Sequence, residues 1–385
     1  MRKIITIGEL GSIITGNTPP RSNLELYGHY TPFIKATDIS ETEKYTYNPE
    51  EYYSKEGHDK YVKSLIPKGA TCVVTIGSIG KKMTMAHCDL FINQAMNAII
   101  PNKNFDKEYV YYAVKNILPN IKMLDSGTAS GRENVSKSAF SKMEILIEDN
   151  IVIQRRIAEI LSRYDSLIEN YQKQIKLLEE AAQRLYKEWF VDLRFPGYEK
   201  TKIVDGVPEG WKKRRVDEIF QIKYGRNLST KLVTVKGNYP VYGANGIIGY
   251  YDKANCHEQV VLITSRGNGS GDVSITFHKE SFVTNNSFIV TPLEQYSYCK
   301  LAFTYYFLKQ ANFRSVRTGA AQPQLTNQSI HTVEILVPLQ QHIEAYCRLV
   351  SPAIELIVEL KECVRCLIDA RDRLLPRLMN GNIEV

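Results

Sequence analysis

Residues 157–189 of the chain, IAEILSRYDSLIENYQKQIKLLEEAAQRLYKEW, decide its architecture. The large apolar residues of this stretch follow one another in alternating steps of four and three positions: Ile157, Leu161, Tyr164, Ile168, Tyr171, Ile175, Leu178, Ala182, Leu185 and Trp189. This spacing is typical of the seam of a coiled coil. A helix of this length extends roughly 50 Å, and its narrow apolar stripe needs an equally narrow partner.

A second segment near the end of the chain has the same pattern. Its seam positions are Ala353, Ile357, Leu360, Val364, Leu367, Arg371, Leu374 and Leu378, with Arg371 where an apolar residue is expected. We expect the two helices to pair with each other. Because Ser351-Pro352 interrupts the start of the second segment, we interpret a new helix capped by Ser351, with a kink at Pro352 as the alternative. Pro376 and Asn380-Gly381 are expected to end it.

The part of the chain between the two segments repeats the part before the first one. Residues 9–16 align with residues 218–225 at an offset of 209, and residues 93–96 align with residues 285–288 at an offset of 192. The order of the matching motifs never changes. Two repeats are too few for a solenoid and indicate a pseudo-twofold molecule instead. We therefore predict an α+β fold, with two similar mainly-β or mixed domains joined by two long helices that form an antiparallel coiled coil.

Composition and charge limit the possible functions. The 385 residues are 43% apolar and 24% charged, which is typical of folded domains. Neither an apolar run long enough for a membrane span nor a secretion signal is recognised, so we expect a cytoplasmic protein without a membrane partner. The seven scattered cysteines do not suggest a disulfide framework. Residues 201–338 carry 16 Lys and Arg against 10 Asp and Glu, whereas residues 1–150 carry 18 against 17. The net charge of +7 permits a polyanionic partner without requiring one.

Motifs for catalysis are incomplete. Residues 77–82, GSIGKK, imitate the end of a phosphate-binding loop, but Thr75 stands where the first glycine belongs. The histidines show no metal-ligand spacing, and Cys363 and Cys366 form a single C-x-x-C inside the second helical segment. We therefore expect no catalytic residue, no metal site and no cofactor in this chain.

Four motifs carry a resemblance to a known family. They are residues 157–161 (IAEIL), residues 189–195 (WFVDLRF), residues 207–211 (VPEGW) and residues 374–381 (LLPRLMNG). In this order the chain resembles the specificity (S) subunit of type I restriction-modification enzymes over essentially its whole length. The resemblance implies target recognition domain 1 at residues 1–150, a spacer helix within 151–196, a linker and target recognition domain 2 at 197–338, and a second spacer helix within 339–385.

The resemblance also implies a function and partners. Each domain would recognise one half of a bipartite, asymmetric target in double-stranded DNA, and the paired helices would set the gap between the halves. Two modification (methyltransferase) subunits would dock on the helices and use S-adenosylmethionine. Restriction subunits would add translocation and cleavage driven by ATP and Mg²⁺.

Polar side chains on the repeated loops are the candidates for DNA contact, because Arg, Lys, Asn and Gln bond base edges and phosphates. In the first block the candidates are Thr18, Arg21, Lys81, Lys82, Arg132 and Asn134. In the second they are Lys223, Tyr224, Arg226, Arg266, Asn268, Arg314, Arg317, Gln322 and Gln324. The alternative for each is a solvated surface residue.

Two other functions stay open on the sequence alone. One is a coiled-coil adaptor whose two domains bind proteins, and the other is a methyltransferase or nuclease fused to such a module. Salt dependence separates the first alternative from DNA binding, because neutralising phosphates makes affinity fall steeply with salt. The second is disfavoured because two domains and two helices leave no room for a catalytic domain.

Overall fold

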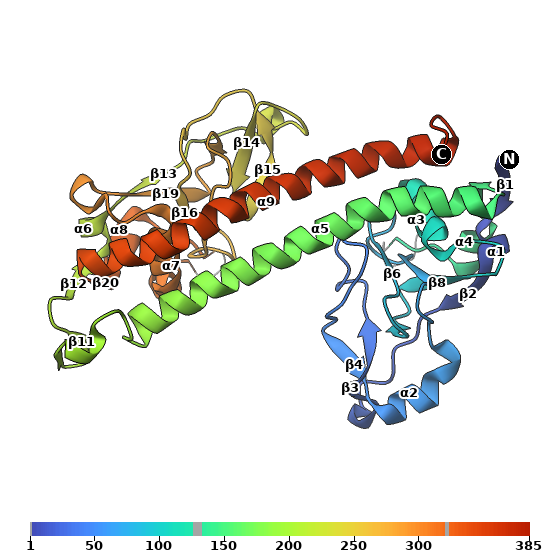
Figure 1. The fold of residues 1–385 in the computed structure, drawn as a ribbon, viewed down its shortest axis with the longest axis horizontal. Coiled ribbons are helices and arrows are strands. Elements are labelled where there is room, and N and C mark those ends of the chain that lie inside the picture. Colours follow the sequence, from blue (N-terminus) through green and yellow to red (C-terminus); the bar gives the residue numbers. More distant parts are fainter. Residues whose placement is uncertain (1, 126–132, 320–322) are drawn as a thin grey trace. The chain divides into compact units, whose positions relative to one another are not determined.

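The computed structural model describes residues 2–125, 133–319 and 323–385 (Figure 1). The chain divides into two compact units, Met1–Tyr171 with Cys363–Val385, and Gln172–Glu362. Each unit holds one β-rich domain together with a part of each long helix, because both boundaries between the units fall inside helices.

The first unit is built on a four-stranded antiparallel sheet. Its order is β2 (Gly11–Thr15), β8 (Met96–Pro101), β5 (Thr71–Val74) and β6 (Met83–Met85). A three-stranded sheet has the order β4 (Glu51–Tyr53), β3 (Tyr27–Ile34) and β7 (Phe91–Ile92), and β1 (Arg2–Thr6) pairs with β9 (Glu144–Glu148).

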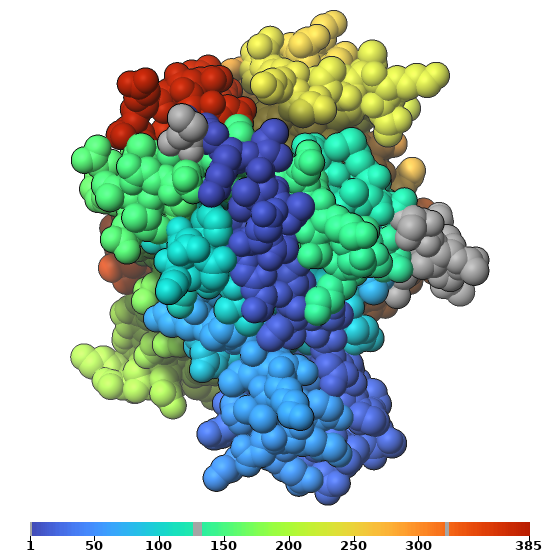
Figure 2. All heavy atoms as spheres, turned by 90° about the vertical axis from the view of Figure 1, so that its right-hand side faces the viewer, coloured from blue at the N-terminus to red at the C-terminus, as the bar shows by residue number. Residues whose placement is uncertain are grey.

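Short helices complete the first unit. They are α1 (Ile7–Leu10), α2 (Lys55–Tyr61), α3 (Lys107–Ile117) and α4 (Lys137–Lys142), with the 3-10 turns η1 (Leu24–Leu26), η2 (Val62–Ser64) and η3 (Leu118–Leu124). In the space-filling view, the light-blue segment around α2 projects at one end of this unit (Figure 2). The core lies between the sheet, α3 and the two long helices, where Val110, Phe140 and Leu161 are fully buried.

The second unit repeats these sheets. The four-stranded sheet has the order β13 (Phe220–Tyr224), β19 (Ser287–Pro292), β16 (Val261–Thr264) and β17 (Val273–Ile275), and the three-stranded sheet has the order β15 (Gly246–Tyr251), β14 (Tyr239–Gly243) and β18 (Phe282–Val283). Strand β12 (Lys212–Arg215) pairs with β20 (Glu334–Val337), and β10 (Ile203–Val204) with β11 (Val207–Pro208). The helices and turns are α6 (Val216–Ile219), α7 (Leu301–Gln310), α8 (Asn327–His331), η5 (Tyr198–Lys200), η6 (Thr230–Leu232), η7 (Glu294–Tyr296) and η8 (Phe313–Val316).

The internal repeat is confirmed at the level of single hydrogen bonds, with one correction. Gly16 N–H donates to the Met96 carbonyl at 3.1 Å, and Gly225 N–H donates to the Ser287 carbonyl at 3.0 Å. Met96 therefore corresponds to Ser287, an offset of 191, and the sequence alignment at 192 was one residue out of register. Both glycines are required, because a Cβ at either position would lie 2.1 Å or 2.3 Å from a backbone carbonyl oxygen.

The two predicted long helices are present as α5 (Ile151–Tyr186), which continues into a π-helical turn η4 (Lys187–Val191), and α9 (Gln340–Asn380). Asn150 caps α5, because its side-chain oxygen accepts the N–H of Val152 at 2.9 Å. The seam residues Ile157, Leu161, Ile168, Ile175, Ala182 and Trp189 are buried, and so are Ile357, Leu360 and Leu378.

The helices pack antiparallel in each unit (Figure 1). In the first unit, Ile157 and Leu161 of α5 share a buried cluster with Leu375 and Leu378 of α9. In the second unit, the Tyr346 hydroxyl of α9 donates to the Ala182 carbonyl of α5 at 3.1 Å. Early residues of one helix thus meet late residues of the other, as the sequence pattern predicts.

The expected break at Ser351-Pro352 is absent, because α9 runs without interruption from Gln340 to Asn380. The interpretation of a new helix capped by Ser351 was wrong: the buried residues Ile343, Val350 and Ile357 flank Pro352 and keep this part of the helix packed despite the missing N–H. Pro376 also lies inside α9. The helix ends at Asn380, where Gly381 takes a left-handed φ of 79°. Among the described residues, no helix combines the length and apolarity needed to cross a membrane.

Candidate nucleic-acid interface

In the first unit, several loops leave the same edge of the four-stranded sheet. Strand β2 ends at Thr15, β5 ends at Val74 and β8 begins at Met96, so the segments that follow or precede them meet. Asn17 N–H donates to the Ile92 carbonyl at 2.9 Å, and Thr75 N–H donates to the Ala95 carbonyl at 2.8 Å. The edge therefore forms one continuous loop cluster.

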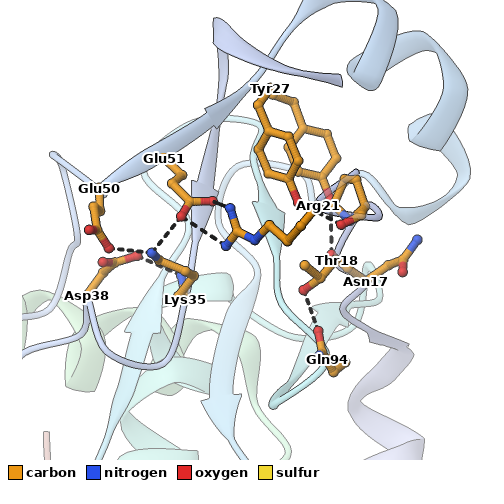
Figure 3. Close-up of polar contacts among 11 residues, drawn as sticks. Asn17, Thr18, Arg21, Tyr27, Lys35, Asp38, Glu50, Glu51 and Gln94 are labelled. Atoms are coloured by element: carbon orange, nitrogen blue, oxygen red, sulfur yellow. Dashed lines mark hydrogen bonds and ion pairs between the residues drawn. The ribbon is translucent and has the colours of Figure 1, made fainter. Parts of the chain in front are cut away.

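The structure ties Thr18 and Arg21 into this cluster (Figure 3). The Thr18 hydroxyl donates to the side-chain oxygen of Gln94. Arg21 donates from Nη1 to Glu51 Oε2 at 2.8 Å and from Nη2 to Glu51 Oε1 at 3.0 Å. Its guanidinium carbon lies 4.9 Å from the centre of the Tyr27 ring. Arg21 is thus held on two sides.

Charges alternate around Arg21. Lys35 Nζ donates to Glu51 Oε1 at 2.9 Å and also to Glu50. The bonds from Arg21 lower the pKa of Glu51, and the bonds to Glu51 raise the pKa of Arg21. Lys35 likewise has a raised pKa, chiefly because it bonds Glu50. The four groups carry two positive and two negative charges, so this cluster supplies fixed geometry rather than a surplus of positive charge.

The remaining candidates of the first unit differ in their surroundings. Lys81 is exposed in the loop between β5 and β6, whereas Lys82 is half-buried and its carbonyl accepts the Val74 N–H at 3.1 Å. Asn134 forms a β-bridge with Ile76, which brings its segment to the same sheet edge. Arg132 lies outside the described residues.

The loop cluster of the second unit repeats these backbone contacts. Gly77 N–H donates to the Glu133 carbonyl at 3.0 Å, and Gly267 N–H donates to the Pro323 carbonyl at 3.0 Å. The bridge between Ile76 and Asn134 corresponds to a bridge between Arg266 and Gln324. Asn17, the residue after Gly16, corresponds to Arg226, the residue after Gly225.

Equivalent backbone positions therefore carry different side chains in the two units. They are Asn17 and Arg226, Ile76 and Arg266, and Asn134 and Gln324. Arg226 and Arg266 are exposed, and no acidic side chain among the described residues pairs with either guanidinium. The second cluster thus presents free positive charge where the first presents neutral groups.

Arg317 and Asn268 are brought together in the second cluster. Arg317 donates from Nη2 to the Asn268 carbonyl at 3.3 Å, while its Nε is buried without a partner among the described residues. Arg314 donates from Nη2 to Asp272 Oδ1 at 2.6 Å. Lys223 is exposed on β13.

Tyr224 has structural contacts. Its ring lies 4.2 Å from that of Phe288, and its hydroxyl donates to the Leu325 carbonyl at 3.2 Å. Gln322 lies outside the described residues. DNA contact by any of the candidate residues stays a prediction.

Sequence reasoning missed Glu51 and Tyr27, which contact Arg21, and Lys35, which bonds Glu51. No spacing rule connects Arg21 to Glu51, because they meet only when β4 pairs with β3. Gln94 was also missed, although it lies in the repeated segment 93–96 and that repeat was a usable signal.

A metal centre is not formed by the part of the chain that is described, since no three His, Cys, Asp or Glu side chains gather there. Cys363 and Cys366 are exposed and unbonded to each other.

Two similar β domains, each with polar loops at one sheet edge and each packed on antiparallel segments of the two long helices within its own unit, define a class of proteins with an internal repeat. The chain matches the family described as type I restriction modification DNA specificity domain over residues 2–180 and 208–347. It belongs to this family.

Individual relatives agree with this assignment. The type I restriction enzyme MjaIX specificity subunit of Methanocaldococcus jannaschii is 26% identical over 98% of this chain and 93% of its own length. The HindI specificity subunit of Haemophilus influenzae is 30% identical over 43% of this chain and 36% of its own. Among solved structures, the S subunit of a type I restriction-modification system from M. genitalium aligns with a TM-score of 0.64 at 20% identity, covering 98% of this chain and 96% of that one.

Proposed function

We propose that this chain is the sequence-specific DNA-binding subunit of a type I restriction-modification complex, and that each β domain contacts one half of a bipartite target. One observation carries the proposal beyond family membership. The two loop clusters share a backbone frame but carry different side chains at equivalent positions, such as Asn17 and Arg226. Since base edges are distinguished by the side chains that meet them, the two half-sites differ in sequence.

The charge distribution supports DNA as the partner. Residues 201–338 hold the surplus of Lys and Arg, and Arg226 and Arg266 of the second cluster are exposed. Free guanidinium groups beside loops suit phosphate and base contacts. A protein-binding adaptor does not require this gathering of cations at one sheet edge.

The partners and cofactors complete the proposal. Modification subunits dock on α5 and α9 and bind S-adenosylmethionine, and restriction subunits add ATP- and Mg²⁺-dependent cleavage. This chain contributes recognition and no catalytic group. The paired helices fix the gap between the two half-sites.

A mobility-shift titration tests this proposal. The full chain with a modification subunit is mixed with duplexes containing or lacking the motif that is methylated in cells expressing both. We expect binding of the motif duplex to exceed binding of the scrambled duplex by at least about 10³-fold. Equal binding of both duplexes would reject sequence recognition, and a failure to bind either duplex would favour the adaptor.

A further inference from the structure

Arg21 and its loop are held by contacts from two strands, β3 and β4. Its loop is anchored by two tyrosines, because the Tyr27 hydroxyl donates to the Pro19 carbonyl at 2.7 Å and the Tyr53 hydroxyl donates to the Asn17 carbonyl at 2.9 Å. The Tyr27 ring then lies beside the Arg21 guanidinium, which Glu51 bonds through both Nη atoms (Figure 3). The Arg21 side chain is therefore ordered before any ligand binds.

Glu51 bonds only some of the N–H donors of Arg21. A guanidinium has five N–H groups, and the two bonds to Glu51 occupy two of them. The Arg21 side chain is 60% exposed, so the other donors lie within reach of solvent or a ligand. Guanine presents two acceptors, N7 and O6, on its major-groove edge, while adenine presents one acceptor and one donor. A donor-only group with paired N–H bonds matches guanine.

The charge balance separates this role from phosphate binding. Glu51 is 21% exposed and Lys35 is 16% exposed, and Lys35 bonds both Glu51 and Glu50. Asp38 adds another carboxylate, which accepts the backbone N–H of Lys35 at 2.7 Å. Glu50 and Glu51 therefore balance the two cations, and the third carboxylate bonds the main chain of Lys35. Such a cluster attracts phosphate weakly, so the benefit of holding Arg21 is orientation.

We propose that Arg21 distinguishes a guanine in the half-site contacted by the first unit, and that Glu51 is the positioning residue that orients its guanidinium. This inference rests on the proposed DNA-binding function and adds one residue and one base to it. Arg21 selects the base, and Glu51 and Tyr27 remove the freedom that would let the guanidinium bond other acceptors.

Selection from a randomised duplex library tests the inference, using the full chain with its modification subunit. The variants are Arg21→Lys, which keeps the charge but loses the planar fork, Arg21→Ala, and Glu51→Gln. Arg215→Ala is the matched control. Arg215 is also exposed and also bonds a carboxylate twice, with both distances to Asp217 at 3.1 Å, but it precedes α6 at the opposite end of β13 from Gly225.

For the wild type we expect a two-part motif with at least one G·C pair in the half assigned to the first unit. Arg21→Lys and Arg21→Ala should lose roughly tenfold to a hundredfold of the discrimination at that one pair, with the other half-site unchanged. Glu51→Gln should lose less at the same pair. The dependence of affinity on salt should stay close to that of the wild type, and the control should select the wild-type motif.

The outcomes separate the two proposals. A wild-type chain that selects no motif would reject the proposed function, and the inference with it. A wild-type motif that Arg21→Ala selects with unchanged discrimination would overturn the inference and leave the function standing. Uniform weakening on all sequences with a shallower salt dependence would also overturn it, because that pattern identifies a phosphate contact. Circular dichroism of each variant confirms that it is folded.

Discussion

Arg371 of α9 and Asp165 of α5 form a buried ion pair in the first unit, with Nη1 and Oδ1 2.5 Å apart and side chains 1% and 7% exposed. Asp165 also accepts the Tyr112 hydroxyl, and Arg371 donates from Nε to Asp372 at 2.9 Å. Arg371, which interrupts the apolar seam of α9, is therefore paired with the carboxylates of Asp165 and Asp372. The positions 186 residues away along the repeat are Ser351 and Leu185, which are uncharged and cannot form an ion pair there. The pair favours one register of α5 against α9.

Breaking this pair should be costly. Asp165→Ala leaves the Arg371 guanidinium buried without its closest counter-charge, and we expect the free energy of unfolding to fall by about 3–5 kcal/mol. Urea denaturation measures the loss. The control is Arg163→Ala on the same helix, which removes an exposed pair with Glu159 and should change the midpoint little. Equal midpoints for the two variants would show that the buried pair does not stabilise the fold.

Lys115 gives the fold a predictable pH dependence. Burial, and then the nearby charge of Arg371, lower the pKa of Lys115 to about 8. Between that pKa and the unfolded value near 10.5 the unfolded chain binds more protons, so stability rises with pH in this window. Lys115→Met removes the cost of the half-buried charge. We expect it to raise the melting temperature at pH 7, with an advantage that shrinks as the pH rises above about 8. An advantage independent of pH would contradict this origin.

Pro352 lies inside α9 and withholds one backbone hydrogen bond. Pro352→Ala restores the N–H, and we expect a gain in stability of up to about 3 kcal/mol. Thermal denaturation measures it. Ser351→Ala is the control for helix propensity alone. We expect its gain in stability to be only a few tenths of the gain from Pro352→Ala. A loss of stability in Pro352→Ala would mean that the proline ring makes packing contacts worth more than the bond.

Arg226 and Arg266 should determine how strongly DNA affinity depends on salt. Each is exposed in the second loop cluster, and neutralising a phosphate releases about one counterion. We expect each Ala substitution to reduce the slope of log affinity against log salt by about one. Fluorescence anisotropy at several salt concentrations measures the slope. Unchanged slopes would place these side chains away from the phosphates.

Much of the fold could be predicted from the sequence, because its signals are local or periodic. The four-three spacing from Ile157 to Trp189 predicted a helix that the structure confirms, and the aligned glycines Gly16 and Gly225 predicted the repeat. Pro352 was misjudged because local backbone preference was given more weight than the packing of Ile343, Val350 and Ile357 around it. Propensity is a weak prior when a helix buries a full apolar stripe.

The site was predicted less completely than the fold. Loop position and residue type pointed to Thr18 and Arg21, but the contact of Arg21 with Glu51 depends on β4 pairing with β3. The polar seam position Arg371 was visible in the sequence, whereas its partner Asp165 lies 206 residues away and outside the apolar pattern. Such pairs follow from tertiary packing, which no local pattern contains.

Exchanging residues 1–150 for those of a relative and sequencing the methylated bases in cells that express the hybrid with its modification subunit tests the central claim most directly. If two unlike domains each recognise one half of the target, the hybrid should methylate a motif with one new half and one unchanged half. A hybrid motif in which both halves change would contradict separate recognition by the two domains.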